Sequence, residues 1–462
     1  MTPHIVRPAG GSWRAATLGC VLVTALLCGG CSGASTSTAG HGNGPARSTG
    51  SATIRVPGQA ATINAALDRA RPGDLVLVSP GVYHESVTVR TDRVVLRGTD
   101  RNRVVIDGEG RRSNGVVVTA AGVSVENLTV RNHLLNGVLV TGMSDADGGL
   151  ARGSDGYQHL DPARFPPLDG FRVRYVTAHA NGLYGIYAFN ARHGVLERNY
   201  ASGSADSGLY VGQCKPCNVL VQDNIAEHNA VGYEGTNASG PIWVLHNRFT
   251  HNRVGLTVNT DYQEAYVPQT GGVVAGNLVA DNNAPDTPEQ ADGGFGIGIG
   301  VAGGQHNALL RNRVSANSRA GIVLASHEDV PPLDNRLEDN DLSANAVDIS
   351  YQASARAPGQ GNCLRGNTLH RTLPENLPHT APCPGGNSRT SATAPRPRTA
   401  PPPAGIPFLD VAPPSAQPQL PHAQSAPATP AVRLPGDVDP DRVPLPGPDL
   451  LAVRPRQGVT VR

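Results

Sequence analysis

Lysine, aromatic residues and net charge are all scarce in this chain of 462 residues. Lys215 is the only lysine, and genomic base composition is the simplest explanation for an almost complete use of arginine. Phe, Trp and Tyr make up 4 % of the chain against 55 glycines, a balance that suits tight repeated turns better than a globular α/β core. The formal net charge of +1 gives no electrostatic case for binding nucleic acid or an anionic membrane surface.

Long apolar runs are also missing, and the apolar stretch at residues 15–27 is too short to span a bilayer. Preceded by Arg7 and Arg14, it has the order of an export signal. The segment that follows resembles a bacterial lipoprotein lipobox, with Gly30 as the small residue before an acylated Cys31. We expect a lipoprotein-type signal peptide over 1–31, a flexible linker over 32–52, and a lipid anchor at the extracellular face of the membrane. Ordinary secretion is the alternative.

Four cysteines remain beyond the signal region, and an even number fits two disulfides in an oxidising compartment. The expected pairs are Cys214–Cys217 and Cys363–Cys383. The Cys-x-x-Cys spacing of the first pair has two other interpretations, a redox site or a metal site. The sequence around it lacks a thioredoxin-like βαβ pattern and a second Cys or His pair at zinc spacing.

What the chain has in abundance is a unit of about 23 residues in which a glycine precedes an aliphatic-x-aliphatic strand. A fixed period of this size indicates stacked structural units, and alternation with period 2 indicates strands. A second register carries asparagine at each turn, so Asn199, Asn224 and Asn247 are expected to form a hydrogen-bonded ladder. The side chains expected inside the stack include Ile186, Ala188, Leu209, Val211, Leu256, Val258, Ile322 and Leu324.

Residues 62–67, 72–74 and 79–85 resemble the capped entry of right-handed parallel β-helices of the pectate-lyase-like superfamily. The later repeats resemble its alginate-epimerase-like and nitrous-oxide-reductase-maturation-like members. The resemblance implies an all-β, right-handed parallel β-helix over 53–385 with a short N-terminal capping helix. It does not choose a function, since the superfamily hosts lyases, hydrolases, epimerases, adhesins and metal-maturation factors. The change to Pro-rich composition predicts a disordered tail over 386–462.

One outer face of the middle repeats concentrates polar and aromatic side chains. Tyr187, Tyr210 and Glu234 occupy its outward positions, and two interruptions of the repeat, 143–170 and 261–271, leave the stack at the same turn. Tyrosines, amides and a carboxylate in register can bind sugar rings by stacking and hydrogen bonding. We therefore expect a polysaccharide or cell-wall glycan as partner, with substrate contacts from Asn190, Gln213, Asn237, Lys215 and Arg192.

Three functions follow as hypotheses. In the first, Tyr187, Tyr210 and Glu234 form the catalytic set of a uronate-type polysaccharide lyase or epimerase. That reaction needs a cation on the carboxylate and a base for the C5 proton. The second is a non-catalytic surface binding or scaffold protein, and the weaker third is a metal-maturation factor. The cation candidates are Arg192, Lys215 or Ca²⁺, and the base candidates are Tyr187, Tyr210, His179 and His193.

Several signatures that would decide the chemistry are missing. The acidic segment with Asp145, Asp147 and Asp155 lacks the spacing of an EF-hand calcium loop. No compact acid-rich motif of characterised lyases or epimerases is present. Hydrolysis would require paired carboxylates, for which Asp206 and Glu234 are candidates whose separation the sequence does not give.

Overall fold

The computed structural model describes residues 51–144, 161–384, 389–390, 401–425 and 442–452. The expected signal peptide, Cys31 and nearly all of the linker lie outside these ranges. The chain divides into units Met1–Thr49 and Gly50–Arg462, and the second unit is the one described below. Among the described residues, no helix has the length and apolar character needed to cross a membrane.

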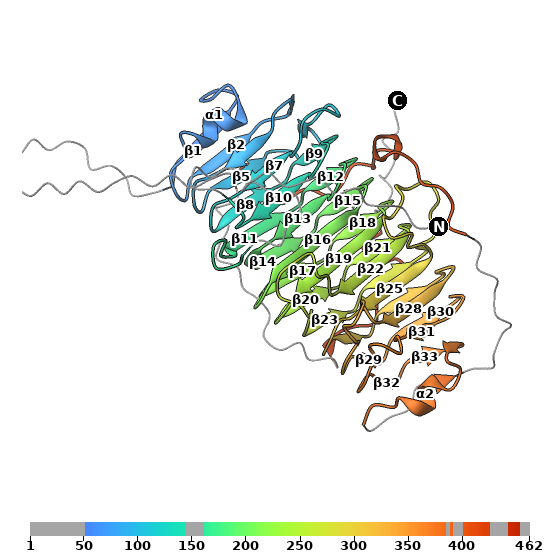
Figure 1. Cartoon of the computed structure of the whole chain (residues 1–462). Coiled ribbons are helices and arrows are strands. Elements are labelled where there is room, and N and C mark those ends of the chain that lie inside the picture. Colours follow the sequence, from blue (N-terminus) through green and yellow to red (C-terminus); the bar gives the residue numbers. More distant parts are fainter. Residues whose placement is uncertain (1–50, 145–160, 385–388, 391–400, 426–441, 453–462) are drawn as a thin grey trace, which may run out of the picture. The chain divides into compact units, whose positions relative to one another are not determined.

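Parallel strands from successive turns of the chain build three sheets. Within each sheet the strands follow one another in sequence order, as Figure 1 shows. Sheet A contains β1 (Thr53–Val56), β2 (Leu75–Val78), β5 (Val95–Gly98), β8 (Val123–Glu126), β11 (Leu168–Arg174), β14 (Ala191–Glu197), β17 (Val219–Gln222), β20 (Ile242–Leu245), β23 (Gly272–Ala275), β26 (Ala308–Leu310), β29 (Arg336–Glu338) and β32 (Cys363–Arg365). Sheet B contains β3 (Gly81–Tyr83), β6 (Val104–Asp107), β9 (Thr129–Arg131), β12 (Thr177–His179), β15 (Tyr200–Ser202), β18 (Ile225–Glu227), β21 (Arg248–Thr250), β24 (Leu278–Ala280), β27 (Arg313–Ser315), β30 (Asp341–Ser343), β33 (Thr368–Leu369) and β35 (Arg389–Thr390). Sheet C contains β4 (Val87–Val89), β7 (Val116–Val118), β10 (Val138–Thr141), β13 (Ile186–Phe189), β16 (Ser207–Cys214), β19 (Val231–Ala238), β22 (Val254–Asn259), β25 (Ile297–Ala302), β28 (Ala320–Ala325), β31 (Ile349–Gln352) and β34 (Thr372–Leu373).

Each coil therefore runs through sheets A, B and C in turn and pairs with the coils before and after it, which is a parallel β-helix. The core lies inside the stack, and the inward alternation expected from the sequence is confirmed. Ile186 pairs in register with Leu209, and both are fully buried. The other side chains expected inside belong to the same buried cluster.

The repeated glycine has a steric cause. At the start of the sheet C strands, a Cβ on Gly185 would lie 2.5 Å from the carbonyl oxygen of Gly208, and one on Gly232 would lie 2.4 Å from that of Gly255. Gly255 and Gly298 stand in the same relation to the coils that follow them. Successive coils approach so closely at this position that only a residue without a side chain fits.

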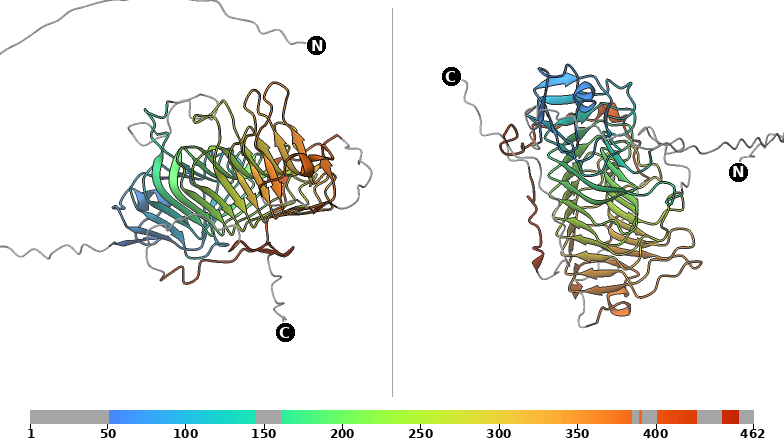
Figure 2. Two further views of the ribbon diagram at one scale, coloured as in Figure 1. Left: turned by 90° about the horizontal axis from the view of Figure 1, so that it is seen from below. Right: turned by 90° about the vertical axis from the view of Figure 1, so that its left-hand side faces the viewer.

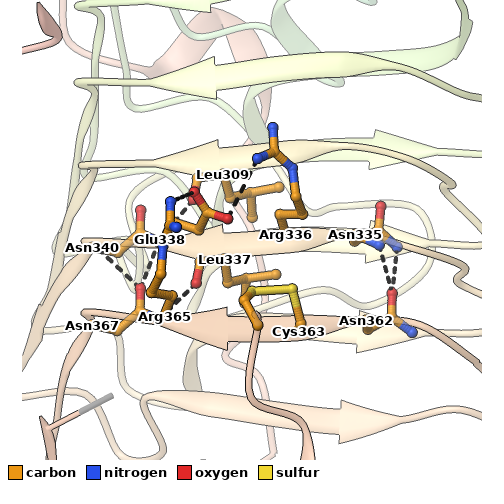
Figure 3. Close-up of a disulfide and its surroundings, with 11 residues drawn as sticks. Leu309, Asn335, Arg336, Leu337, Glu338, Asn340, Asn362, Cys363, Arg365 and Asn367 are labelled. Atoms are coloured by element: carbon orange, nitrogen blue, oxygen red, sulfur yellow. Dashed lines mark hydrogen bonds and ion pairs between the residues drawn. A yellow bond between two sulfur atoms is a disulfide. The ribbon is translucent and has the colours of Figure 1, made fainter. Parts of the chain in front are cut away.

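Asparagine ladders run through the turns, and the one expected at Asn199, Asn224 and Asn247 is confirmed. The Asn199 amide Nδ2 donates to Asn224 Oδ1 at 3.0 Å, and Asn224 repeats the bond to Asn247 at 3.0 Å. Figure 3 shows two further rungs, Asn340–Asn367 and Asn335–Asn362, on either side of Cys363. These buried amides satisfy turn backbone groups that the parallel sheets leave unpaired.

Removing one rung should destabilise the whole stack. In the Asn247→Ala variant, Asn224 N–H and Nδ2 lose the Oδ1 acceptor at 2.9 and 3.0 Å, and Val221 C=O loses its donor at 3.0 Å. Because these groups are buried, we expect the free energy of unfolding to fall by about 3 kcal/mol, measured by chemical denaturation. The exposed Asn376→Ala is the control and should change it by less than about 0.5 kcal/mol. Equal effects of the two changes would contradict a stabilising ladder.

A capping helix at the N-terminal end and a disulfide at the C-terminal end close the stack, and the sequence predicts both. The capping helix α1 (Ile63–Leu67) begins after Thr62, whose side chain accepts from Ala65 N, and it buries Ile63, Ala66 and Leu67. Both expected disulfides form: Cys214–Cys217 closes a turn after β16, and Cys363–Cys383 ties β32 to the segment after α2 (Leu377–Thr380). The second bridge fixes β32, the last strand of sheet A, to the segment that covers it.

The Pro-rich C-terminal region differs from the expectation of a disordered tail in the two parts that are described. Residues 401–425 and 442–452 lie against the β-helix (Figure 2). Pro403 and Ile406 bind at the turn between sheets B and C, and the later parts bind at the turns between sheets A and B and at the start of sheet B strands. Their only regular element is the short 3₁₀ helix η1 (Phe408–Asp410). Low apolar content predicts a tail without a core of its own, but it gives no information on docking to another part of the chain.

Candidate functional site

The outward column on sheet C has the register that the sequence predicts. Parallel pairing places Tyr187 beside Tyr210, Tyr210 beside Glu234, and Glu234 beside Thr257 on four consecutive coils. Leu139 precedes the column and Gly300 follows it. The polar and aromatic side chains are thus confined to the middle of the sheet.

Aromatic rings fill the N-terminal end of this column. The ring centroids of Tyr187 and Tyr210 lie 4.8 Å apart, and Tyr184, from the turn before β13, lies 4.3 and 4.8 Å from them. Met143 and Phe165 pack on the same cluster. Tyr210 is only 3 % exposed, whereas Tyr184 and Tyr187 are half-buried, so the latter two present the accessible aromatic surface.

Two carboxyl groups meet immediately beside the tyrosines. Asp206, in the turn before β16, and Glu234, on β19, both contact the hydroxyl of the buried Ser207. Ser207 Oγ lies 3.2 Å from Asp206 Oδ1 and 2.7 Å from Glu234 Oε2. A hydroxyl has one proton to donate, so both contacts are hydrogen bonds only when one carboxyl is protonated and donates to Ser207 Oγ. Thr236 donates to the other Glu234 oxygen at 3.1 Å.

The electrostatics of the pair favour a single shared proton. Burial, reinforced by the charge of Asp206, raises the pKa of Glu234 to about 8. Burial also raises the pKa of Asp206, to about 6, while hydrogen bonds from Ser207 and Tyr184 oppose that rise. Near neutral pH, Glu234 is therefore protonated and Asp206 ionised, which is how an acid and a base coexist in one site.

A third carboxyl group enters from the 261–271 loop. Glu264 is 7 % exposed and accepts a hydrogen bond from the Tyr210 hydroxyl. Burial raises the pKa of Glu264 well above its usual range and also that of Tyr210. A tyrosine acts as a base only after it has lost its proton, so this environment opposes the base role that the sequence suggested for Tyr210.

These raised pKa values make stability depend on pH. Between the ordinary glutamate pKa of 4.5 and the raised values, the folded protein binds more protons than the unfolded chain. The free energy of unfolding must therefore fall as pH rises through that window. We expect Glu264→Gln to lose less stability than wild type between about pH 6 and about pH 9, while the exposed Glu375→Gln behaves like wild type. Urea unfolding at both pH values measures this, and parallel losses in all three proteins would contradict it.

A groove continues from Glu234 over the next coils and has a volume of about 290 Å³. Thr257 and Gly300 form its floor, and Gln290 and Asp292 border it from the long connection between β24 and β25. The charge of Asp292 contributes to the raised pKa of both Asp206 and Glu234. Arg319, at the turn before β28, also lines the groove.

The structure corrects the roles predicted for three amides. Asn190, Gln213 and Asn237 are buried, with side chains that bind loop backbone instead of facing a ligand. Asn190 Nδ2 donates to Phe165 O at 2.8 Å, Gln213 Oε1 accepts from Ala265 N at 3.0 Å, and Asn237 Nδ2 donates to Glu264 O at 3.1 Å. All three adopt positive φ where the chain leaves sheet C, which turns their side chains beneath the loops.

The predicted cations and histidines lie away from the carboxyl pair's immediate contacts. Arg192 is paired with Asp169 at 3.1 Å, and His193 binds the same carboxylate. Lys215 is exposed in the turn closed by Cys214–Cys217. His179 lies on sheet B, buried, with Nδ1 3.0 Å from Ser202 Oγ.

The alternatives to this site are a metal site and a second, larger hollow, and the described part of the chain provides neither a metal-binding cluster nor a carboxyl pair in that hollow. There, no group of three or more His, Cys, Asp or Glu side chains is placed to hold a metal ion, and Asp145, Asp147 and Asp155 lie outside it. A hollow of about 810 Å³ lies on another face, between Tyr175 and the C-terminal segments. The carboxylate lining it, Asp223, is paired with His246 at 2.8 Å, so no carboxyl pair is available there.

Comparison with known proteins agrees with this architecture. Residues 114–269, which include the carboxyl pair and the tyrosines, match the family model of a right handed beta helix region. The chain is a right-handed parallel β-helix protein. No curated protein matches this β-helix protein in sequence.

Solved structures similar to this β-helix protein include two A-modules of Azotobacter vinelandii mannuronan C-5 epimerases. AlgE6 is 16 % identical over 73 % of this chain and 97 % of its own, with a TM-score of 0.47. AlgE4 is 16 % identical over 69 % and 91 %, with a TM-score of 0.42. Pectate lyase Pel9A is 14 % identical over 72 % of each chain, with a TM-score of 0.40. Likeness at this level assigns no activity to the chain.

Proposed function

We propose that this β-helix protein is an exported, membrane-anchored enzyme that hydrolyses a polysaccharide at the sheet C groove. The observation that carries the proposal is the Ser207 hydroxyl held between Asp206 and Glu234, which lets one proton be shared by two carboxyl groups. Paired carboxyl groups of unequal pKa are the catalytic requirement for hydrolysis of a glycosidic bond. Export and acylation of Cys31 are proposals that rest on the sequence.

The two carboxyl groups take complementary roles. Glu234 gives its proton to the glycosidic oxygen as the bond to the anomeric carbon breaks, and an Asp206 oxygen bonds to that carbon, as the short separation of carboxyl groups that share one hydroxyl requires. Water then adds to the same carbon as its bond to Asp206 breaks, and Glu234 takes the proton of that water. Tyr184 and Tyr187 offer aromatic surface for a sugar ring, and Thr257 and Gln290 offer hydrogen bonds farther along the groove. Ser207 positions both carboxyl groups.

A uronate lyase or epimerase fits the described groove less well. Either reaction requires a cation against the substrate carboxylate at the reacting carbon. The immediate neighbours of the carboxyl pair are acidic or neutral, and Arg319 lies at the turn before β28, which is three strand pairings along sheet C from the β19 strand of Glu234. The binding-scaffold alternative requires the same groove without turnover.

A polysaccharide screen separates these functions. The mature chain and its Glu234→Gln, Asp206→Asn and Ser207→Ala variants are incubated with neutral and uronate-containing polysaccharides. New reducing ends and the absorbance of unsaturated uronate are both recorded. We expect reducing ends without unsaturated product, formed about 10²- to 10⁴-fold more slowly by the first two variants and with a smaller loss in the third. Unsaturated product that survives Asp206→Asn would favour a lyase, and retention of glycan without any product would favour a scaffold.

A further inference from the structure

The arginines along one side of the β-helix hold the Pro-rich tail almost entirely through its backbone carbonyls. Arg101 Nη1 donates to Pro418 O at 2.8 Å, and Arg313 Nε donates to Pro446 O at 2.7 Å. Arg248 Nη1 lies 3.3 Å from both Pro448 O and Leu450 O. Further carbonyls of this kind are those of Gln417, Ala423 and Val443, bound by Asn102, Arg97 and Arg311. The Pro403 carbonyl is bound by Arg253 at the turn between sheets B and C, and it lies apart from this side.

This pairing matches donors with acceptors. Proline has no N–H, so a proline-rich segment offers carbonyl acceptors and few donors, whereas an arginine side chain offers donors alone. Pro407 and Val411, on either side of η1, have φ/ψ of −56°/142° and −67°/129°, near polyproline II values. An extended chain of this kind presents its carbonyls outward because it makes no internal hydrogen bonds.

The segments are also seated by apolar contacts. Leu420 and Ala423 are 8 and 6 % exposed and pack on Tyr175, at the turn between sheets A and B. Val443 packs on a second apolar cluster several coils later, formed by Ala275, Ala308 and Leu310 on the sheet A strands β23 and β26. Where the tail chain does supply an N–H, an asparagine side chain meets it: Leu420 N donates to Asn127 Oδ1 at 2.7 Å.

We propose that this side of the β-helix is a binding track for extended, proline-rich polypeptide, and that the protein's own tail is its resident ligand. The track is formed by the turns between sheets A and B and by the first residues of sheet B strands, with Arg101 in a turn and Arg248 and Arg313 at the start of β21 and β27 as its main donors. The track binds backbone carbonyls more than side chains. Its ligand is therefore recognised by an extended backbone conformation and a high proline content. It is separate from the sheet C groove and does not depend on the function proposed for that groove.

The test uses the full mature chain with a protease recognition sequence inserted within residues 391–400. After cleavage, size-exclusion chromatography should show the fragment that begins near residue 401 still bound to the β-helix. Fluorescent peptides of residues 412–425 and 442–452 should then bind to the cleaved protein by exchange. An unrelated proline-rich peptide should compete with them, and a Gly/Ser peptide of equal length should not.

Arginine variants make the test specific. Loss of charged hydrogen bonds in the Arg248→Gln/Arg313→Gln variant should weaken binding of the 442–452 peptide about tenfold or more. Arg336→Gln, which removes an arginine paired with Glu338 on sheet A, is the matched control and should leave binding unchanged. Arg101→Gln should weaken binding of the 412–425 peptide in the same way. If Arg101→Gln does not fold, the Arg248→Gln/Arg313→Gln variant still tests whether arginines bind the tail. Separation of the fragment on cleavage, or binding that ignores these arginines, would overturn the proposal.

Discussion

Replacing Glu234 by glutamine is expected to lower the turnover of a hydrolysed polysaccharide by about 10²- to 10⁴-fold, the range that general acid catalysis contributes. Glutamine can accept from Thr236 through its oxygen and donate to Ser207 Oγ through its NH₂, as the protonated carboxyl does, but it has no acidic proton to give to the leaving oxygen. The measurement is kcat from reducing-end formation, with circular dichroism to show that the fold is kept. Because glutamine is always neutral, the variant should also be more stable than wild type above about pH 8.

The neighbouring Thr257→Val provides the matched control for that experiment. Thr257 lies beside Glu234 in the same outward column and lines the same groove, yet it has no titrating group. Its loss should raise KM more than it lowers kcat. Equal losses of kcat in Glu234→Gln and Thr257→Val would show that Glu234 acts only in binding.

The pH dependence of the wild-type reaction follows from the same pair. Activity should rise as Asp206 ionises near its pKa of about 6 and fall as Glu234 loses its proton near about 8. The two limbs belong to the coupled pair, so the Asp206→Asn variant should shift the alkaline limb downward by removing the charge that helps to raise the Glu234 pKa. A profile whose alkaline limb is unmoved in Asp206→Asn would contradict the coupling.

Adding one methyl group at Gly232 is expected to destabilise the β-helix by about 3 kcal/mol or more, the upper range for overpacking. The new Cβ would lie 2.4 Å from Gly255 O on the next coil, and that atom belongs to a paired backbone which cannot move without separating the coils. Chemical denaturation of Gly232→Ala measures the effect.

Gly300→Ala tests whether the loss of stability depends on the position of the glycine in the stack or on the loss of any glycine. Gly300 faces outward on β25, and a Cβ there would meet only Thr257 Cγ2, at an ordinary 3.5 Å. The free energy of unfolding of this variant should lie within about 0.5 kcal/mol of that of wild type. Similar losses in Gly232→Ala and Gly300→Ala would contradict the steric origin of the repeat.

The periodic part of the molecule was predictable because stacking makes every coil obey the same constraints. The glycine spacing, the inward Ile186 and Leu209, and the Asn224–Asn247 rung are all consequences of one repeating geometry. The outward alignment of Tyr187, Tyr210 and Glu234 follows from the same register. Pairing of Cys363 with Cys383 followed from the small number of cysteines available.

The site was less predictable because its decisive groups lie in non-repeating segments. Glu264 and Asp292 reach the column from loops whose course has no period, and only the raised pKa values of the assembled site reveal them. Asn190, Gln213 and Asn237 were expected on the outer face because they recur three residues after the outward positions, and the repeat pattern does not reveal the positive φ that turns their side chains beneath the loops. The docking of the tail was missed because proline content predicts a lack of core but not the arginines that bind the tail.

The most direct measurement is a carboxyl titration of the folded protein by NMR, comparing wild type with Glu234→Gln and Asp206→Asn. We expect one glutamate to titrate near pH 8 in wild type, to be absent from the titration of Glu234→Gln, and to move to lower pH in Asp206→Asn. If every glutamate of the wild type titrates near the ordinary value of about 4.3, the shared proton does not exist and the proposed catalytic pair is wrong.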